Sequence, residues 1–536
     1  MTAKTDDDTL RSIVIAGGGA AGWLSAAIIA AEHNLPHNPA LRVTLVESPN
    51  VKTLGVGEGT WPTMRDTLRK IGIDECEFLL SCDASFKQGT RFINWRGTKN
   101  TSLSQDVFDH PFGLPEGFFD TDIAAWWLLN QNKNITNGGA FSSLVSTQPA
   151  LCDNFKAPKQ LQTPPYAAVA NYGYHLNAHK FAELLKQHCI EKFGVTHIQG
   201  HIEKILVDSN NNISALECTT PKAGEKRIDG DLFIDCTGFA ARLIKGHYQQ
   251  ALTSLKGLKN DSAMAIQANY VNQQSNIASA TYSTAHAHGW LWDIGLPTRK
   301  GVGCVYSSEY CNDDTAKDTL LSYLQNDPST TAVDESAIRK ITFTPGYREQ
   351  AWVNNCVAIG TSAGFVEPLE ASALVMVELS AKYVAEHLPA TKTLATKVAK
   401  HFNHNFSQRW QRIIDFLKLH YVLSQRTDSD YWCAMADKST ASEQLNDWLE
   451  QWQHRPVTVG DFIYAQELFP AASYMYVLYS MQQPSTPSLN LARYRAARLD
   501  AAQTAIKQNH QRTLQQLSAL PSNREYLTAL RKQARP

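Results

Sequence analysis

The chain has 536 residues, of which 43% are hydrophobic, so it is long enough to bury a large core. Its formal net charge of −1 excludes the strongly basic surface of a protein that binds nucleic acid or an anionic membrane. The ten cysteines include no C-x-x-C pair and no H-E-x-x-H motif occurs, so neither a disulfide framework nor a metal site is predicted. The acidic residues 5–8 are unlike the basic start of a signal peptide, and we expect a soluble, cytoplasmic protein.

The first predicted strand is a β-branched run at residues 13–15, which ends in glycines and is followed by an alanine-rich helix. The glycines follow the G-x-G-x-x-G pattern of a dinucleotide site, in which they permit a tight turn, close approach of the pyrophosphate and close packing of helix and strand. N–H groups at the helix start face the anion. The residues expected at the cofactor here are Gly17, Gly19, Ala20, Ala21 and Gly22. A similar turn without a nucleotide is the alternative interpretation.

A second strand is predicted at residues 41–47, and it ends in an acid. Glu47 lies about 25 residues after the last glycine of the motif, close to the ~20 typical of the carboxylate that accepts the ribose hydroxyls. Glycines alternate again at residues 55–59, ahead of a helix that starts near Pro62. This stretch predicts a loop that closes over the cofactor, with Val56 and Gly57 in contact with it.

Residues 84–95 are predicted to form a strand that contains Lys87, and a lysine in a strand is ordinarily exposed. Aromatic residues gather at 108–113 and 126–129, where they either pack in the core or form a wall for a planar substrate. An amphipathic helix is expected to end near residues 193–194.

The apolar run at residues 231–239 predicts a strand that returns to the sheet beside the first one. Residues 262–306 alternate between apolar and polar, which favours antiparallel strands, and the spacing of Trp290 and Trp292 places both indoles on one face. A buried strand at 355–360 precedes a helix that runs to about residue 387, with Pro368 and acids as its start signals. No second G-x-G-x-x-G motif appears, which weakens the case for a separate NAD(P)H site.

These elements predict an α/β protein with an FAD-binding Rossmann-like fold of the glutathione-reductase type. Residues 1–394 are expected to form the FAD-binding domain, with substrate-binding β-sheet segments interleaved at about 84–180 and 260–345. Residues 395–536 are expected to form a mainly helical region that closes the substrate site. Its predicted helices are 402–424, 442–452, 459–482 and 489–517.

Several stretches together resemble the flavin-dependent tryptophan halogenases over essentially the whole chain. They are residues 17–23, 55–58, 86–87, 235–239, 289–294, 364–370 and 415–421. The strand with two tryptophans is the most distinctive of them. The resemblance implies an enzyme that takes reduced FAD from a separate NAD(P)H-dependent flavin reductase. It also implies the use of O2 and chloride or bromide to form hypohalous acid, which halogenates a tryptophan- or indole-type aromatic; homodimers are common in the family.

The resemblance also implies roles for individual residues. Lys87 would guide the oxidant, by a hydrogen bond or as a haloamine, and Glu370 would orient the oxidant and take the proton of the ring. The halide would bind to the N–H groups of Ser372 and Ala373, and Thr361 and Leu374 would border the flavin. The substrate would stack on His110 and Phe112. Trp290 and Trp292 would line the gap between flavin and substrate.

Other interpretations of the same residues stay open. Lys87 also fits a surface lysine, Glu370 an acid that merely favours a helix start, and the two tryptophans fit the core. Gly295 stands where the family usually has proline, and residues 468–476 do not match the segment that holds free tryptophan in that family. A simpler indole or a larger aromatic is therefore an alternative substrate. The alternative functions are an FAD-dependent aromatic monooxygenase, which would hydroxylate, and a flavin-binding protein without turnover.

Overall fold

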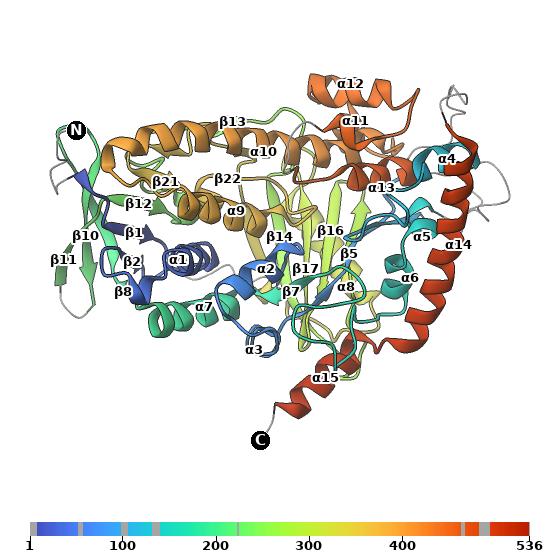
Figure 1. Cartoon of the computed structure of the whole chain (residues 1–536), viewed down its shortest axis with the longest axis horizontal. Coiled ribbons are helices and arrows are strands. Elements are labelled where there is room, and N and C mark those ends of the chain that lie inside the picture. Colours follow the sequence, from blue (N-terminus) through green and yellow to red (C-terminus); the bar gives the residue numbers. More distant parts are fainter. Residues whose placement is uncertain are drawn as a thin grey trace.

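The computed structural model describes residues 8–51, 57–97, 106–130, 140–221, 224–462, 467–481 and 494–534. A nucleotide-type sheet lies at one end of the molecule and a larger, mostly antiparallel sheet lies nearer its middle, and one long helix runs from the first toward the second (Figure 1). None of the helices in the described ranges is long and apolar enough to cross a membrane.

The first sheet has six strands in the order β20-β21-β12-β1-β2-β8. The strands are β1 (Ser12–Ala16), β2 (Arg42–Glu47), β8 (Thr196–Gln199), β12 (Leu232–Asp235), β20 (Trp352–Val353) and β21 (Cys356–Ala358). All neighbours pair in parallel except β20 and β21. Strands of a parallel sheet are covered on both faces, which is why β1 and β12 are mostly apolar, with Ser12 and Asp235 at their ends. The prediction that the strand at 231–239 lies beside the first strand is confirmed.

Helices cover this sheet, and a small β-sheet extends it. Helix α1 packs against both α7 and α9, and Figure 1 shows it between them. The helices here are α1 (Ala20–Glu32), α2 (Thr63–Lys70), α3 (Glu75–Ser81), α7 (Ala178–Phe193) and α9 (Ser372–Glu386). The antiparallel strands β9 (His201–Val207), β10 (Ile213–Thr220) and β11 (Gly224–Asp229) form the extension.

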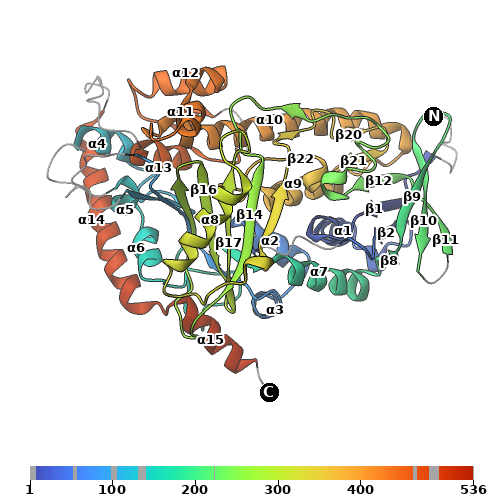
Figure 2. The same ribbon diagram turned by 180° about the vertical axis from the view of Figure 1, so that it is seen from behind.

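The second large sheet has seven strands in the order β18-β14-β17-β16-β15-β5-β6. Its strands are β5 (Gly89–Ile93), β6 (Val107–Pro111), β14 (Ser262–Asn269), β15 (Thr281–His286), β16 (Gly289–Gly295), β17 (Arg299–Tyr306) and β18 (Arg339–Thr342). Only β5 and β15 pair in parallel, so the antiparallel strands predicted between residues 262 and 306 are confirmed. Helix α8 (Asp313–Gln325) packs on this sheet (Figure 2).

The strand predicted at residues 84–95 is two strands that belong to different sheets. The first, β4 (Ser85–Lys87), pairs with β7 (Gly173–Asn177), which also pairs with β3 (Gly57–Gly59). The second, β5, starts at Gly89, where an added Cβ would overlap the carbonyl oxygen of His110. Gln88 between them is fully buried and donates from its side chain to the carbonyl of Lys156. Lys87 therefore stands where the chain passes from one sheet to the other.

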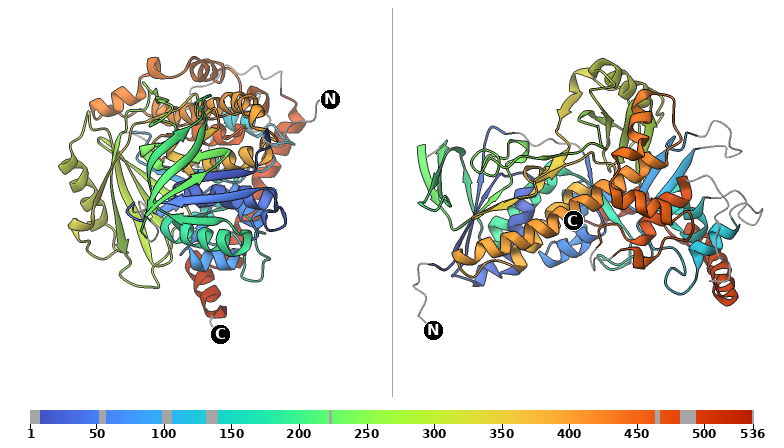
Figure 3. Two further views of the ribbon diagram at one scale, coloured as in Figure 1. Left: turned by 90° about the vertical axis from the view of Figure 1, so that its left-hand side faces the viewer. Right: turned by 90° about the horizontal axis from the view of Figure 1, so that it is seen from above.

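Helix α10 (Ala395–Leu423) runs over the nucleotide-type part and on toward the seven-stranded sheet (Figure 3). The other helices of this region are α4 (Ile123–Asn130), α5 (Phe141–Val145), α6 (Gln148–Asp153), α11 (Asp430–Ala436), α12 (Glu443–Gln451), α13 (Ala471–Met481), α14 (Ala496–Ala519) and α15 (Asn523–Gln533). The helix predicted at 459–482 begins only at Ala471, directly after Pro470. Helix α15 contacts β4 through two hydrogen bonds. The side-chain amide of Asn523 donates to the Phe86 carbonyl, and its oxygen accepts from the Phe86 N–H.

The start of α9 also differs from the prediction. Pro368 and Glu370 precede the helix rather than forming its first turn, since Ala371 takes a left-handed conformation with φ of 54° and the helix begins at Ser372. No acid lies in the first turn. Glu370 is therefore free to project away from the helix axis.

Candidate functional site

The glycines of the G-x-G-x-x-G motif have different environments. Gly17 has a φ of +117°, and a Cβ there would overlap the carbonyl oxygen of Cys236. A Cβ on Gly22 would overlap the carbonyl oxygen of Gly17. A Cβ on Gly19 would meet no atom within 4 Å. Gly17 and Gly22 thus serve close packing, whereas Gly19 borders open space that a ligand can enter.

Helix α1 starts without a capping side chain. Its N-cap is Gly19, so the N–H groups of the first turn, at Ala20 and Ala21, receive no side-chain oxygen. Helix α7, by contrast, is capped by Asn177, which accepts from two N–H groups. Exposed N–H groups at the positive end of a helix favour an anion. Both observations fit the pyrophosphate of a dinucleotide such as FAD.

Glu47 ends β2 beside this turn, and its side chain lies against Gly18. His197 lies 2.9 Å and Lys186 3.3 Å from its carboxylate. Burial raises the pKa of Glu47, but the hydrogen bonds and charges of these two partners outweigh burial, so the pKa is lowered. The carboxylate is ionised and stays an acceptor. Val56 lies outside the described residues, and Gly57 packs close to Ile294.

A second uncapped helix start lies close to the first. Helix α9 follows Ala371, which offers no capping side chain, and its first turn contains Ser372, Ala373 and Leu374. The short turn η6 (Gly360–Ser362), which includes Thr361, contacts α9 and approaches α1, because a Cβ on Gly360 would lie 3.0 Å from the Cβ of Ala21. The predicted residues of α1, η6 and α9 are therefore brought together.

Lys87 is 1% exposed at the end of β4. Its Nζ lies 5.3 Å from the centre of the Phe112 ring, and it would be 3.1 Å from a Cβ on Gly59. Among the described residues no acceptor makes a hydrogen bond with this ammonium group. Burial lowers the pKa of Lys87 to about 8, although the Glu370 carboxylate opposes the shift. A buried lysine without a hydrogen bond is costly, and such groups are common at functional sites.

Glu370 is 3% exposed and faces two imidazoles. Its Oε1 lies 2.9 Å from Nδ1 of His110 and 3.3 Å from Nε2 of His420, and its Oε2 accepts from Thr90 at 3.3 Å. The indole N–H of Trp61 donates to its backbone carbonyl at 2.7 Å. Burial by itself raises the pKa of Glu370, but His110 and His420 outweigh burial, and the pKa lies well below its usual range.

A pocket of about 120 Å³ opens beside Glu370. Aromatic rings, prolines and small residues form most of its wall: Trp61, Pro62, His110, Pro111, Phe112, Gly113, Leu114, Glu370, Leu468, Phe469, Pro470, Ala472, Ser473 and Tyr476. The predicted substrate residues His110 and Phe112 are thus brought together with Glu370. Trp290 and Trp292 do not line this pocket.

The two tryptophans lie in the core beside a second buried glutamate. The indole N–H of Trp290 donates to Glu367 at 2.7 Å, and the rings of Trp290 and Trp292 meet edge to face at 6.4 Å. The side chains of Asn260 and Tyr421 donate to the same oxygen of Glu367. Burial raises the pKa of Glu367, because these donors are uncharged and only partly oppose the desolvation.

Sequence analysis missed three residues around Glu370. Thr90, His420 and Ser473 reach it, directly or through His110, whose Nε2 lies 2.9 Å from the Ser473 hydroxyl. His420 falls within the stretch 415–421 that resembles the halogenases, which was the available signal. No sequence pattern marks Ser473, because its partner His110 lies 363 positions away.

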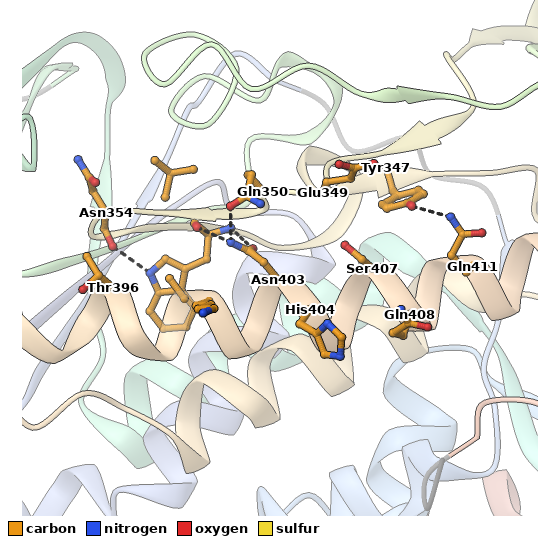
Figure 4. A pocket seen from close by; sticks show the side chains of 14 residues that line it. Tyr347, Glu349, Gln350, Asn354, Thr396, Asn403, His404, Ser407, Gln408 and Gln411 are labelled. Carbon is orange, nitrogen blue, oxygen red and sulfur yellow. Dashed lines mark hydrogen bonds between the residues drawn. The ribbon is translucent and has the colours of Figure 1, made fainter. Parts of the chain in front are cut away.

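A larger groove of about 610 Å³ lies elsewhere, between α10 and the segment that leads into β20 (Figure 4). The amide of Asn403 bonds to both backbone groups of Trp352, and Gln411 donates to the hydroxyl of Tyr347. These polar groups hold the groove's own walls together. None of the predicted site residues lines it.

A model of the tryptophan halogenase family matches residues 12–496 of the chain. Tryptophan 7-halogenase RebH of Lentzea aerocolonigenes is 32% identical over 447 residues, which cover 81% of this chain and 79% of that protein. A tryptophan halogenase structure from Shewanella frigidimarina is 44% identical, with a TM-score of 0.90 over 98% of both chains. Xcc4156, a flavin-dependent halogenase from Xanthomonas campestris, is 28% identical, with a TM-score of 0.84 over 97% of this chain and 98% of that one. The protein therefore belongs to the tryptophan halogenase family of flavin-dependent enzymes.

Proposed function

We propose that this enzyme uses reduced FAD, O2 and chloride or bromide to form hypohalous acid, and that it halogenates a neutral indole-type aromatic. The observation that carries the proposal is the pairing of Lys87 and Glu370 beside an aromatic pocket. Lys87 is buried without a hydrogen-bond acceptor among the described residues, and Glu370 stays ionised at the pocket wall.

The glycine turn and two helix starts would hold FAD. Bound reduced FAD supplies the electrons with which O2 and halide give hypohalous acid. The open space at Gly19 and the first turn of α1, with Ala20 and Ala21, suit the pyrophosphate. The remaining proposed contacts are Glu47 with the ribose, Val56 and Gly57 in the covering loop, and Thr361 and Leu374 along the flavin.

The start of α9 would hold the halide. The N–H groups of Ser372 and Ala373 lie in an uncapped first turn, and the positive end of a helix favours an anion. Glu370, two positions before Ser372, faces away toward the pocket. The halide and the proton acceptor would thus occupy neighbouring but separate positions.

Lys87 would hold the oxidant beside the substrate. Its Nζ has no competing acceptor among the described residues, so it can donate to the oxygen of hypohalous acid. With its pKa lowered to about 8, about a tenth of the Lys87 side chains are neutral amines at pH 7, which is the form that could carry the halogen. Both forms keep the oxidant from leaving the protein.

Glu370 would complete the substitution. As the new carbon–halogen bond forms, the halogen–oxygen bond breaks, and the Lys87 ammonium group gives a proton to the oxygen, which leaves as water. The ring carbon then loses its proton to Glu370, which restores the aromatic ring. The lowered pKa makes Glu370 a weak base, and a weak base suffices because the cationic ring is a strong acid.

The pocket favours a neutral substrate. Among its described lining residues, Glu370 alone carries a formal charge, so no cation there would pair with the carboxylate of an amino acid. His110 and Phe112 offer ring surfaces for a planar aromatic. Trp290 and Trp292 would limit access between flavin and substrate from within the core.

The partners follow from the same proposal. A separate NAD(P)H-dependent reductase would supply the reduced flavin, and the enzyme could act as a homodimer. The division into an FAD-binding part at 1–394 and a helical closing part at 395–536 also remains a proposal.

The test is a product assay by mass spectrometry. The purified protein receives FAD, a flavin reductase, NADH, O2 and bromide, with indole, tryptophan or a phenol as substrate. We expect a bromine isotope doublet on indole that disappears in Lys87→Met, while hypobromite formation continues. A doublet that survives in Lys87→Met contradicts the role of Lys87. A hydroxylated product without bromine favours a monooxygenase, and flavin binding without any oxidant favours a protein without turnover.

A further inference from the structure

Three side chains at the pocket beside Glu370 form a hydrogen-bonded chain that the proposed function uses only in part. The Ser473 hydroxyl lies 2.9 Å from Nε2 of His110, and Nδ1 of the same ring lies 2.9 Å from Oε1 of Glu370. All three residues line the pocket, and each is more than nine-tenths buried. An ionised carboxylate can only accept, so Nδ1 of His110 carries the proton of the neutral ring, and Nε2 accepts from the Ser473 hydroxyl.

This order of hydroxyl, imidazole and carboxylate is the one that turns a serine into a nucleophile. The imidazole takes the hydroxyl proton, and the carboxylate fixes the tautomer of the ring and stabilises the imidazolium that forms. Burial by itself raises the pKa of Glu370, but His110 and His420 outweigh burial and keep it ionised. Glu370 is therefore in the form that this arrangement requires.

Separate elements of the fold hold the three groups in place. Ser473 is the third residue of α13, His110 lies on β6, and Glu370 precedes α9. Helix α13 packs against β6, and Tyr476 on α13 donates to the Gly113 carbonyl at 3.0 Å. Within the part of the chain that the structure describes, the Ser473 hydroxyl has no hydrogen-bond partner except His110. Its proton is therefore directed at the imidazole.

We propose that this pocket also hydrolyses small, neutral carboxylic esters of aromatic alcohols, with Ser473 as the nucleophile and His110 as the general base and acid. The oxygen of Ser473 bonds to the acyl carbon while its proton moves to Nε2 of His110. The bond from the acyl carbon to the alcohol oxygen then breaks, and His110 gives that oxygen the proton. Glu370 acts through His110 as a positioning residue.

Water completes the cycle. It gives a proton to His110 as its oxygen bonds to the acyl carbon, the bond to Ser473 breaks, and the proton passes from His110 back to the serine oxygen. One ester and one water give one acid and one alcohol, and no oxidant or reductant takes part. The first N–H groups of a helix have no partner within it, so those of Ala471 and Ala472 at the start of α13 are suited to the oxyanion.

The pocket wall fits this class of substrate. Phe112 and Tyr476 offer ring surfaces for an aromatic alcohol. Leu114, which also lines the pocket, is 47% exposed, so ester and water can enter from solvent there. A volume of about 120 Å³ favours a short acyl group such as acetyl. The charge of Glu370 at the wall disfavours an ester that carries its own carboxylate.

The test uses 4-nitrophenyl acetate with the full-length protein in the absence of flavin, reductase and halide, so its outcome is independent of the proposed function. We expect a burst of about one 4-nitrophenol per protein molecule, followed by slower turnover. Ser473→Ala and His110→Gln should each abolish the burst and lower turnover about 10²-fold. Glu370→Gln should lower kcat to a similar extent and leave KM unchanged, because Glu370 acts through His110.

Ser480→Ala is the matched control. It removes another buried hydroxyl of α13, one that does not line the pocket, and it should leave ester hydrolysis within about threefold of wild type. Equal rates in wild type and Ser473→Ala would overturn the inference.

The site of acylation gives a second, covalent readout. After an acid quench during the burst, peptide mass spectrometry should find the acetyl group on Ser473. An acetyl group on Lys87 instead would show that the neutral amine is the nucleophile, and it would overturn the inference. Should Ser473→Ala fail to fold, phenylmethylsulfonyl fluoride tests the wild type: it should modify Ser473 and stop hydrolysis, and hydrolysis that continues unchanged counts against the serine. Indole bromination is measured separately, and its failure beside normal ester hydrolysis would refute only the proposed function.

Discussion

Glu367 and Glu370 are three positions apart and equally buried, yet their environments are opposite. Glu367 meets only uncharged donors, and burial raises its pKa. Glu370 meets two imidazoles, and its pKa lies below the usual range despite burial. Each has a buried lysine nearby, but Lys418 donates to the Met435 carbonyl at 2.6 Å, whereas Lys87 has no hydrogen-bond acceptor among the described residues. The lysine of the first pair is hydrogen-bonded within the protein, and the lysine of the second is left able to bind something else.

The largest expected effect is that of replacing Lys87, and replacement of Lys418 is the control. Lys87→Met should lower bromination of indole about 10³-fold, because nothing else at the pocket would hold the oxidant. Lys418→Met removes an equally buried ammonium group, and it should leave the rate within about threefold because its bond serves the backbone. Product formation by mass spectrometry checks both. Equal losses of bromination activity in the two variants would show that Lys87 and Lys418 do not differ in function.

The second largest effect on turnover is expected for substitution of Glu370, and substitution of Glu367 should not share it. Glu370→Gln keeps the shape of the side chain and an acceptor for His110, but it cannot take a proton, so turnover should fall about 10²-fold. Hypobromite trapped in solution should rise as the substrate step slows. A variant that brominates indole at the wild-type rate would show that another base serves the ring.

A third prediction concerns pH and stability. Burial holds the pKa of Lys87 at about 8, below the 10.5 of the unfolded chain, so its charge destabilises the folded protein below pH 8. That cost disappears as pH rises from 8 to 10.5. Lys87→Met should therefore be more stable than wild type by about 3 kcal/mol below pH 8, and the gain should vanish near pH 10.5. Thermal melts across this range measure it. A gain independent of pH would point to packing instead.

The smallest effect is expected for Glu367→Gln. The amide oxygen can still accept from Trp290, Tyr421 and Asn260, and its NH2 group would replace the oxygen that has no partner. We expect a loss of about 1 kcal/mol in unfolding free energy and nearly unchanged bromination. Denaturant unfolding and the indole assay check the two parts. A loss of activity like that of Glu370→Gln would place both glutamates in the reaction.

Local patterns sufficed for the parts of the fold built from neighbouring residues. The glycine turn, the strand at 231–239 and the antiparallel strands at 262–306 were predicted because each depends on short-range spacing. The break between β4 and β5 was missed, since the space beside Gly89 is filled by a carbonyl from another strand. The helix expected from residue 459 was placed too early because its apolar pattern continues across Pro470.

The site was predicted only in part for a similar reason. Lys87 and Glu370 lie in stretches that resemble the family, so they could be named. The imidazole partners of Glu370 depend on contacts across 260 positions to His110 and on a helix packed from a different region. Ser473 is 363 positions from His110, and nothing in its own neighbourhood marks it. Tertiary packing, rather than local pattern, assembled the surroundings of Glu370.

The contact between Asn523 and Phe86 has a consequence for how the enzyme matures. The two residues are 437 positions apart, and the asparagine side chain pairs with the backbone directly beside Lys87. A ribosome therefore makes Asn523 437 positions after the strand that it contacts. Until Asn523 is made, the backbone of Phe86 lacks these two hydrogen bonds, so the position of Lys87 beside it is less firmly fixed. The proposed placing of the oxidant by Lys87 would thus depend on a segment made long after β4, whereas formation of the oxidant itself does not depend on Lys87.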